Sequence, residues 1–203
     1  MSMNYIDKMT WTREDIHDYL RDHMNAGRYQ HTLGVVKAAV ELAHLHGADA
    51  EKAEYAALCH DMLKEKDRDW LISFITDNGE EAGEGLLAWK TLHAQAGAIF
   101  AERQCGQADS DILNAIRFHT TGRVQMSLLE KIIFVADFIE EGRSFRGVDE
   151  LRQRARTDLD AAVLEALENS LSFLKEKGEH VMPISEAARN HYYSVVAERN
   201  HHE

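Results

Sequence analysis

The sequence predicts an all-α protein, and three observations support this fold class. Apolar residues recur at helical spacing along most of the 203 residues, whereas no segment shows the strict alternation of a half-buried strand. The chain contains a single proline, the residue that most disfavours a helix interior. Residues that cap helix starts precede several apolar segments, and glycines follow several of them. We therefore expect a bundle of helices.

Capping signals and apolar periodicity place the expected helices along the chain. The patterns Thr12-Arg13-Glu14-Asp15 and Ser127-Leu128-Leu129-Glu130 are both typical of a capping box at a helix start. Gly83 and Gly85 weaken the helical pattern of residues 80–89. The expected helices begin at Thr12 and then cover about 28–46, 49–63, 67–78, 80–89, 93–104, 110–118, 127–139 and 158–177, with a last helix from Ser185.

No internal repeat, low-complexity linker or change of composition divides the chain. We therefore expect one domain over residues 1–203. The terminal His201-His202 pair is expected to be exposed and is given no role. Solvated helix faces are expected for five charged residues, namely Glu80, Glu81, Arg152, Arg154 and Arg156.

Composition and charge exclude several classes of protein. The hydrophobic fraction of 44% indicates a folded chain, and no apolar run approaches the ~20 residues of a membrane span. The net charge of −12 disfavours nucleic-acid polymers and membranes as partners, because both are bound through basic patches. Residues 1–8 have no apolar core typical of a signal peptide, so a cytoplasmic location is expected. Cys59 and Cys105 alone make neither a disulfide framework nor a thiolate metal site.

Six side chains stand out as candidate metal ligands, since neutral imidazole is the commonest metal ligand and the chain has 12 histidines. Their order is H…HD…H…H…D, with gaps of 29, 32, 26 and 18 residues, about one helix and its connection each. Histidine and carboxylate without thiolate suit Fe, Mn, Co, Ni or Zn, as one ion or two. The six residues are His31, His60, Asp61, His93, His119 and Asp137.

Each of these residues also has an ordinary structural explanation. A single histidine near an apolar helix is more often a hydrogen-bonded core residue than a ligand. Asp137 lies within the almost wholly apolar segment 132–139, where a buried carboxylate needs either a metal or hydrogen-bond donors. A helical bundle with coincidental histidines would bind no stoichiometric metal. The complete ordered set, rather than any member of it, favours the metal site.

The local sequences around these residues resemble a known family. Residues 28–35 read RYQHTLGV, residues 58–64 read LCHDMLK, residues 115–123 read AIRFHTTGR, residues 137–143 read DFIEEGR and residues 186–190 read EAARN. These motifs are similar to those of the YqeK-type symmetrical bis(5′-nucleosyl)-tetraphosphatases, within the HD-domain superfamily of metal-dependent phosphohydrolases. The resemblance covers about residues 28–190. It implies an all-α HD-domain helical bundle, iron or a similar divalent metal, and hydrolysis of diadenosine tetraphosphate to two ADP.

The resemblance also implies roles for individual residues. The primary metal ligands would be His31, His60, Asp61 and Asp137. His93 and His119 would hold a second metal or contact phosphate, and they join Asp61 and Asp137 as catalytic candidates. Nucleotide contacts are expected from Arg28, Lys64, Thr120 and Arg143. The segment expected to close over the base consists of His180, Val181, Met182, Pro183, Ile184 and Ser185.

Three positions depart from the family's pattern. Ala94 follows His93 where the family has glycine, Glu141 stands where it usually has proline, and Met182 stands where histidine is more usual. None of these changes removes a candidate metal ligand.

Two other functions stay open at this point. The first is another nucleotide phosphatase or phosphodiesterase on the same scaffold, which would use the same ligands. The second is a nucleotide-sensing module that holds a dinucleoside polyphosphate or an ADP- or GDP-type nucleotide without turnover. A homodimer is also left open.

Overall fold

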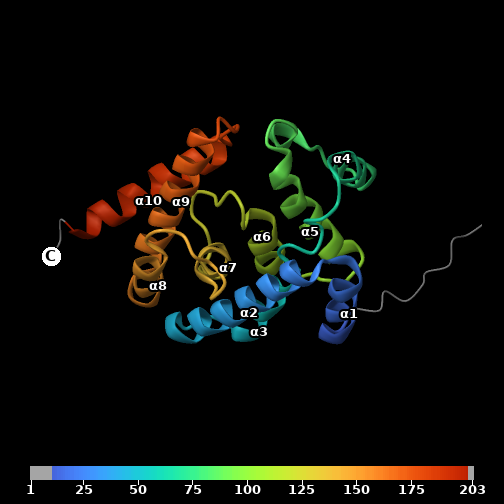
Figure 1. The fold of residues 1–203 in the computed structure, drawn as a ribbon, viewed down its shortest axis with the longest axis horizontal. Helices are drawn as coiled ribbons and strands as arrows, with labels where there is room; N and C mark the ends of the chain where they lie inside the picture. The colour runs from blue at the N-terminus through green and yellow to red at the C-terminus, as the bar shows by residue number, and fades with distance from the viewer. Residues whose placement is uncertain (1–10, 201–203) are drawn as a thin grey trace, which may run out of the picture.

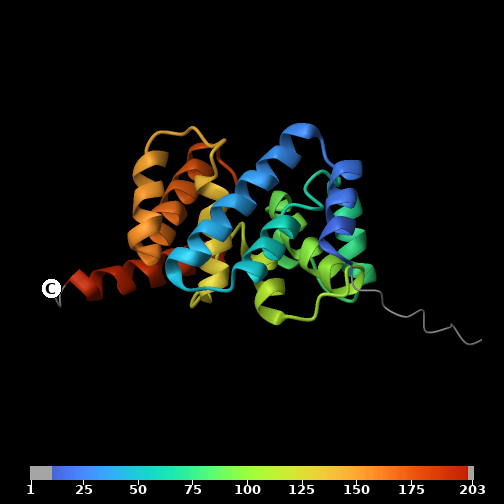
Figure 2. The same cartoon turned by 90° about the horizontal axis from the view of Figure 1, so that it is seen from below.

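The computed structural model describes residues 11–200, and within this range it contains ten α-helices, two 3₁₀ helices and no strand (Figures 1 and 2). The all-α prediction is therefore confirmed. The expectations for residues 1–8 and for His201-His202 fall outside the described residues. The helices are α1 (Arg13–His23), α2 (Ala26–His46), α3 (Ala50–Cys59), α4 (Arg68–Asp77), η1 (Gly83–Leu86), η2 (Trp89–Thr91), α5 (Leu92–Arg103), α6 (Ser110–Phe118), α7 (Leu128–Ile139), α8 (Val148–Thr157), α9 (Leu159–Glu176) and α10 (Pro183–Asn200).

Side-chain caps precede four of the predicted helices. Thr12 and Asp15 form a complete capping box at α1, while the side chains of Asp49, Asp67 and Ser127 accept hydrogen bonds from backbone N–H groups of the first turns of α3, α4 and α7. Such caps contribute about 1 kcal/mol each, because they satisfy N–H groups that the helix cannot pair.

Two predicted helices differ from those in the structure. The helix expected over 49–63 ends at Cys59, and hydrogen-bonded turns follow it through Lys66. The prediction of a helix over 80–89 is wrong, because only the short 3₁₀ helices η1 and η2 form in this region. Gly83 has φ +49°, a conformation that a continuous right-handed helix cannot contain.

Helix α7 lies at the centre of the molecule and packs against α2, α6 and α9. Figure 1 shows α2 and α3 side by side below it, α4 and α5 on one flank, and α8 to α10 on the other. Phe134 of α7 is fully buried, and most of the buried apolar side chains form one continuous cluster. Helices α2, α3, α5, α6 and α7 thereby bring the candidate ligands to one place. Within residues 11–200, no helix is long and apolar enough to cross a membrane.

Candidate metal centre

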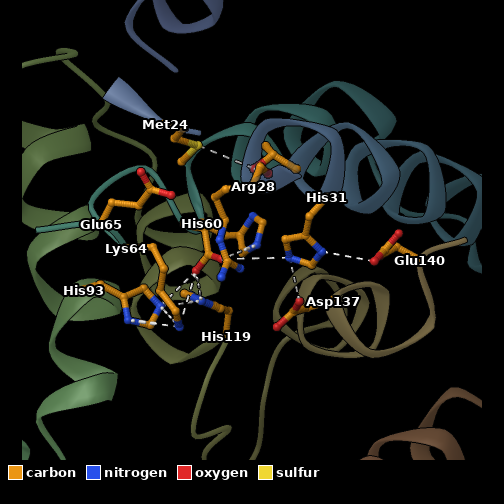
Figure 3. A network of polar contacts seen from close by, with 12 residues as sticks. Met24, Arg28, His31, His60, Lys64, Glu65, His93, His119, Asp137 and Glu140 are labelled. Carbon is orange, nitrogen blue, oxygen red and sulfur yellow. Dashed lines mark hydrogen bonds and ion pairs between the residues drawn. The ribbon is translucent and has the colours of Figure 1, made fainter. Parts of the chain in front are cut away.

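The six candidate ligands converge although they come from five helices (Figure 3). His31 lies in α2, His60 and His119 are the C-cap residues of α3 and α6, His93 lies in α5, and Asp137 lies in α7. Asp61 follows His60 directly. The sequence-based expectation that the six side chains would meet around one place agrees with this geometry.

Two overlapping groups of donor atoms are close enough to hold a cation. One comprises His31, His60 and Asp137, the other comprises His60, Asp61 and His119, and the donor atoms of each group lie within 4.8 Å of one another. His31 Nε2 is 3.1 Å from Asp137 Oδ1, and His60 Nε2 is 3.6 Å from Asp61 Oδ2.

Burial of these donors provides a test of whether a metal fits. In the described part of the chain, Nε2 of His31 and Nε2 of His60 are buried without a hydrogen-bond partner. Buried polar atoms without partners are rare because their desolvation is costly. A divalent cation between the imidazoles and carboxylates would satisfy both nitrogens, and the N/O donor set suits Fe, Mn, Co, Ni or Zn. The residues of this site therefore fit a divalent metal ion.

Local hydrogen bonds orient three of the imidazoles. Nδ1 of His60 donates to the carbonyl of Ala57 over 2.6 Å, and Nδ1 of His119 donates to that of Ile116 over 2.7 Å. His93 Nδ1 donates in the same way to the carbonyl of Lys90 at 2.8 Å. Since a carbonyl only accepts, each Nδ1 carries a hydrogen, and in the neutral imidazole Nε2 then presents a lone pair to the site.

Burial also keeps two histidines in the form that binds metal. It lowers the pKa of His60 to about 4, and burial together with the ammonium of Lys64 lowers the pKa of His93 to about 4. Both imidazoles are therefore neutral at neutral pH.

The two aspartates are held in the charged form. Burial alone would raise the pKa of Asp61, but His60, His119 and His93 hold it well below its ordinary value. For Asp137 the same opposing effect of burial is outweighed by His31, His60 and Arg143, which lower the pKa. The site therefore contains two carboxylates that carry negative charge at neutral pH.

Asp61 connects two sets of side chains through its two oxygens. Oδ2 faces His31 and His60 at 3.9 and 3.6 Å, whereas Oδ1 faces His93 Nε2 at 3.0 Å and His119 Nε2 at 3.4 Å. The two latter nitrogens are 3.2 Å apart, and Lys64 Nζ is 3.2 Å from His93 Nε2. Lone pairs that converge at this spacing repel one another unless a cation or a proton lies between them.

Two arginines flank the donor atoms, each paired with one of the two aspartates. Arg28 donates to Asp61 Oδ2 over 2.9 Å, and Arg143 forms an ion pair with Asp137. Both line an open hollow of about 590 Å³ together with His31. Guanidinium groups suit the bidentate recognition of phosphate. Contact of Arg28 and Arg143 with phosphate stays a prediction.

A second hollow, of about 480 Å³, lies beside the other end of the site. Its lining includes Lys90 and Thr91, which precede His93, and Thr120 and Thr121, which follow His119. Thr120 also lines an adjoining hollow of about 320 Å³, and its buried Oγ1 finds no partner among residues 11–200.

The segment expected over the base is only partly placed at these two hollows. His180, Met182 and Ser185 line the larger one, and Ile184 lines the smaller one. Val181 and Pro183 line neither of them. His180 Nε2 is 3.5 Å from a carboxylate oxygen of Glu84, so this segment and η1 are in direct contact.

Three charged residues have structural contacts that the sequence did not reveal. Arg152 was expected on a solvated face, which is wrong, because its guanidinium donates to the carbonyls of Ile139, Glu140 and Arg143. Glu80 likewise forms a bidentate ion pair with Arg117. Glu140, which sequence analysis quoted within a motif but gave no role, accepts a hydrogen bond from His31 Nδ1.

A family comparison identifies the scaffold that holds this site. The HD-domain family model matches residues 28–142, the stretch that contains all six candidate ligands. The chain belongs to the HD-domain family.

The similarity extends to nearly the full length of several relatives. The chain is 43% identical to the symmetrical bis(5′-nucleosyl)-tetraphosphatase of Halalkalibacterium halodurans, over 84% of this chain and 91% of the relative. It is 42% identical to the Bacillus subtilis protein of the same name, over 84% and 92%. The crystal structure of an HD superfamily hydrolase from Clostridium acetobutylicum, described as involved in NAD metabolism, has a TM-score of 0.89 and 45% identity, with 91% and 98% coverage. The resemblance seen in the motifs is thereby confirmed.

Proposed function

We propose that this HD-domain protein hydrolyses diadenosine tetraphosphate in the middle of its phosphate chain and releases two ADP. One observation carries the proposal: the buried His/Asp donors adjoin a hollow flanked by two arginines, in a chain that matches two symmetrical tetraphosphatases over about nine-tenths of their length. Such a site combines the groups that activate water with groups that bind phosphate.

The first cation would be held by His31, His60, Asp61 and Asp137. We expect this cation to be iron, with Mn, Co, Ni or Zn as alternatives. Asp61 Oδ1, His93 and His119 would hold a second one. When bound, a divalent cation supplies a nucleophilic hydroxide at neutral pH and polarises a phosphoryl oxygen. The two neutral imidazoles and the charged carboxylates support this assignment.

The chain's own cations would handle the charge of the phosphates. Arg28 and Arg143 would exchange their carboxylate partners for phosphate oxygens, and Lys64 would face the phosphate at the centre of the site. His93 or His119 would orient a phosphate oxygen or move a proton to or from the reacting oxygens. The bond that breaks joins one inner phosphorus to the central bridging oxygen, so the departing group is ADP.

The 480 Å³ hollow is the proposed position of one nucleoside. Its walls include Trp89 and Met182 as apolar surfaces and Thr120 as a hydrogen-bonding group. This mixture is typical of small-molecule pockets, in which apolar walls carry a few polar groups. A single domain and a cytoplasmic location remain part of the proposal.

A different phosphohydrolase and a nucleotide sensor are the competing functions. A sensor would bind the dinucleotide without multiple turnover, although all six ligand positions are filled in this chain. Multiple-turnover assays on diadenosine tetraphosphate with added metal separate an enzyme from a sensor. Assays on ATP, ADP and cyclic nucleotides separate a diadenosine tetraphosphate hydrolase from other phosphohydrolases.

The position of cleavage provides the direct test of the proposed reaction. Chromatography of the products should show ADP alone. In oxygen-18 water, a single turnover should label the terminal phosphate of half of the ADP, because one inner phosphorus receives the oxygen of water. ATP and AMP as main products would contradict symmetrical cleavage, while leaving the metal site unchallenged.

A further inference from the structure

His31 is oriented differently from the other three histidines of the site. His60, His93 and His119 each donate from Nδ1 to a carbonyl three residues earlier. His31 lies inside α2, where helix hydrogen bonds already use the neighbouring carbonyls. Its Nδ1 instead donates to Glu140 Oε1 over 3.1 Å, a residue 109 positions away (Figure 3).

Both carboxylate oxygens of Glu140 are in use. Oε1 accepts from His31, and Oε2 accepts from the backbone N–H of Gly142 over 2.6 Å. The residue is only 5% exposed. A buried carboxylate with two separate donors has a defined orientation, because turning it would break both hydrogen bonds.

The surface of α2 leaves space for this carboxylate at Gly34. A Cβ atom on residue 34 would lie 2.5 Å from Glu140 Oε2, a distance that would force one of them to move. The glycine lies one helical turn after His31. Any larger residue at position 34 would therefore push Glu140 away from the histidine.

Arg152 of α8 fixes the turn that carries Glu140. Its guanidinium donates to the carbonyls of Ile139, Glu140 and Arg143 at 2.9, 2.8 and 2.9 Å. One side chain thus ties together the end of α7 and the residues that follow it. The same turn directs Arg143 towards Asp137.

We propose that Glu140 is a positioning residue that holds His31 as its Nδ1–H tautomer, so that the Nε2 lone pair faces the metal, and that Arg152 holds Glu140 in place. The inference rests on the proposed metal site and goes beyond it, because it assigns a function to residues that are not ligands. Partners of this kind orient ligating histidines, and their loss typically weakens metal binding roughly 10–100-fold.

The test is Glu140→Gln, with Glu141→Gln as the matched control. Glutamine offers one acceptor oxygen where two donors require one each. If the glutamine amide nitrogen faces His31, it donates, and His31 Nδ1 must accept that hydrogen bond. The imidazole hydrogen then lies on Nε2, where it blocks metal binding. The control removes the same charge one position away, from a side chain that is 70% exposed and paired with Lys37.

The readout is metal affinity, measured by titrating metal-free protein with Co²⁺ or Mn²⁺ against a competing chelator. Glu140→Gln should bind roughly 10–100-fold more weakly, with an altered Co²⁺ absorption spectrum, whereas Glu141→Gln should match the unsubstituted protein. Equal affinities and spectra in all three, even if Glu140→Gln unfolds more easily, would overturn the proposal. No stoichiometric metal in the unsubstituted protein would instead refute the proposed function.

Gly34→Ala keeps the test decisive if Glu140→Gln fails to fold. Alanine is a better helix former than glycine and leaves every proposed ligand in place. Because its Cβ would displace Glu140, we expect weaker Co²⁺ binding by the folded variant. Unchanged Co²⁺ affinity and spectrum in this variant would equally contradict the proposal.

Discussion

Replacing Asp61 by alanine is expected to remove bound metal and to lower kcat by more than about 100-fold. Loss of a residue that only hydrogen-bonds to a metal ligand already costs up to about 100-fold, and Asp61 is itself a proposed ligand. Asp137→Ala should act in the same direction but less severely. Asp61 faces four histidines through its two oxygens, whereas Asp137 lies beside only one of the two groups of donors. Metal content by elemental analysis and turnover of diadenosine tetraphosphate are measured on the same samples.

The exposed Asp22 provides the control for this pair, because Asp22→Ala makes the same chemical change away from the site. It should leave metal content and turnover unchanged. Normal metal content in both Asp61→Ala and Asp137→Ala would show that the metal binds elsewhere.

Removing either flanking arginine is expected to raise KM about 10-fold to 100-fold, since a charge-assisted hydrogen bond contributes about 1.5–3 kcal/mol. Arg28→Ala and Arg143→Ala should leave metal content nearly unchanged, because neither residue offers a lone pair to a cation. Steady-state kinetics with diadenosine tetraphosphate, together with elemental analysis, check both statements.

Arg154→Ala is the matched control, because Arg154 forms a half-exposed ion pair with Glu165 on the surface. Such pairs contribute little, so its KM should stay close to that of the unsubstituted protein. Small and equal effects of all three substitutions would mean that the phosphate chain lies away from Arg28 and Arg143.

The fold class and the convergence of the candidate ligands were predictable because both depend on local patterns. Ser127 and the apolar run after it predicted α7, and the structure has that helix from Leu128 to Ile139. Its central position followed from the same run, since a helix that is apolar on most sides needs neighbours on most sides. Asp137 was therefore expected inside the molecule, where its carboxylate needs a metal or hydrogen-bond donors.

The features that the sequence did not reveal depend on contacts between distant segments. Arg152 resembles its exposed neighbours in a strongly charged helix, and only the packing of α8 beside the end of α7 places its guanidinium on three carbonyls. The role of Glu140 was hidden in the same way, because its partner His31 lies on another helix. Helical periodicity also predicted a continuous helix over residues 80–89, which does not form because Gly83 adopts a positive φ.

Removal and return of the metal tests the central claim most directly. The protein is treated exhaustively with a chelator, and turnover of diadenosine tetraphosphate is measured before and after one divalent ion is added back. We expect the metal-free protein to be inactive and Fe²⁺ or Mn²⁺ to restore the formation of ADP. Full turnover by verified metal-free protein would contradict the claim that His31, His60, Asp61 and Asp137 form a catalytic metal centre.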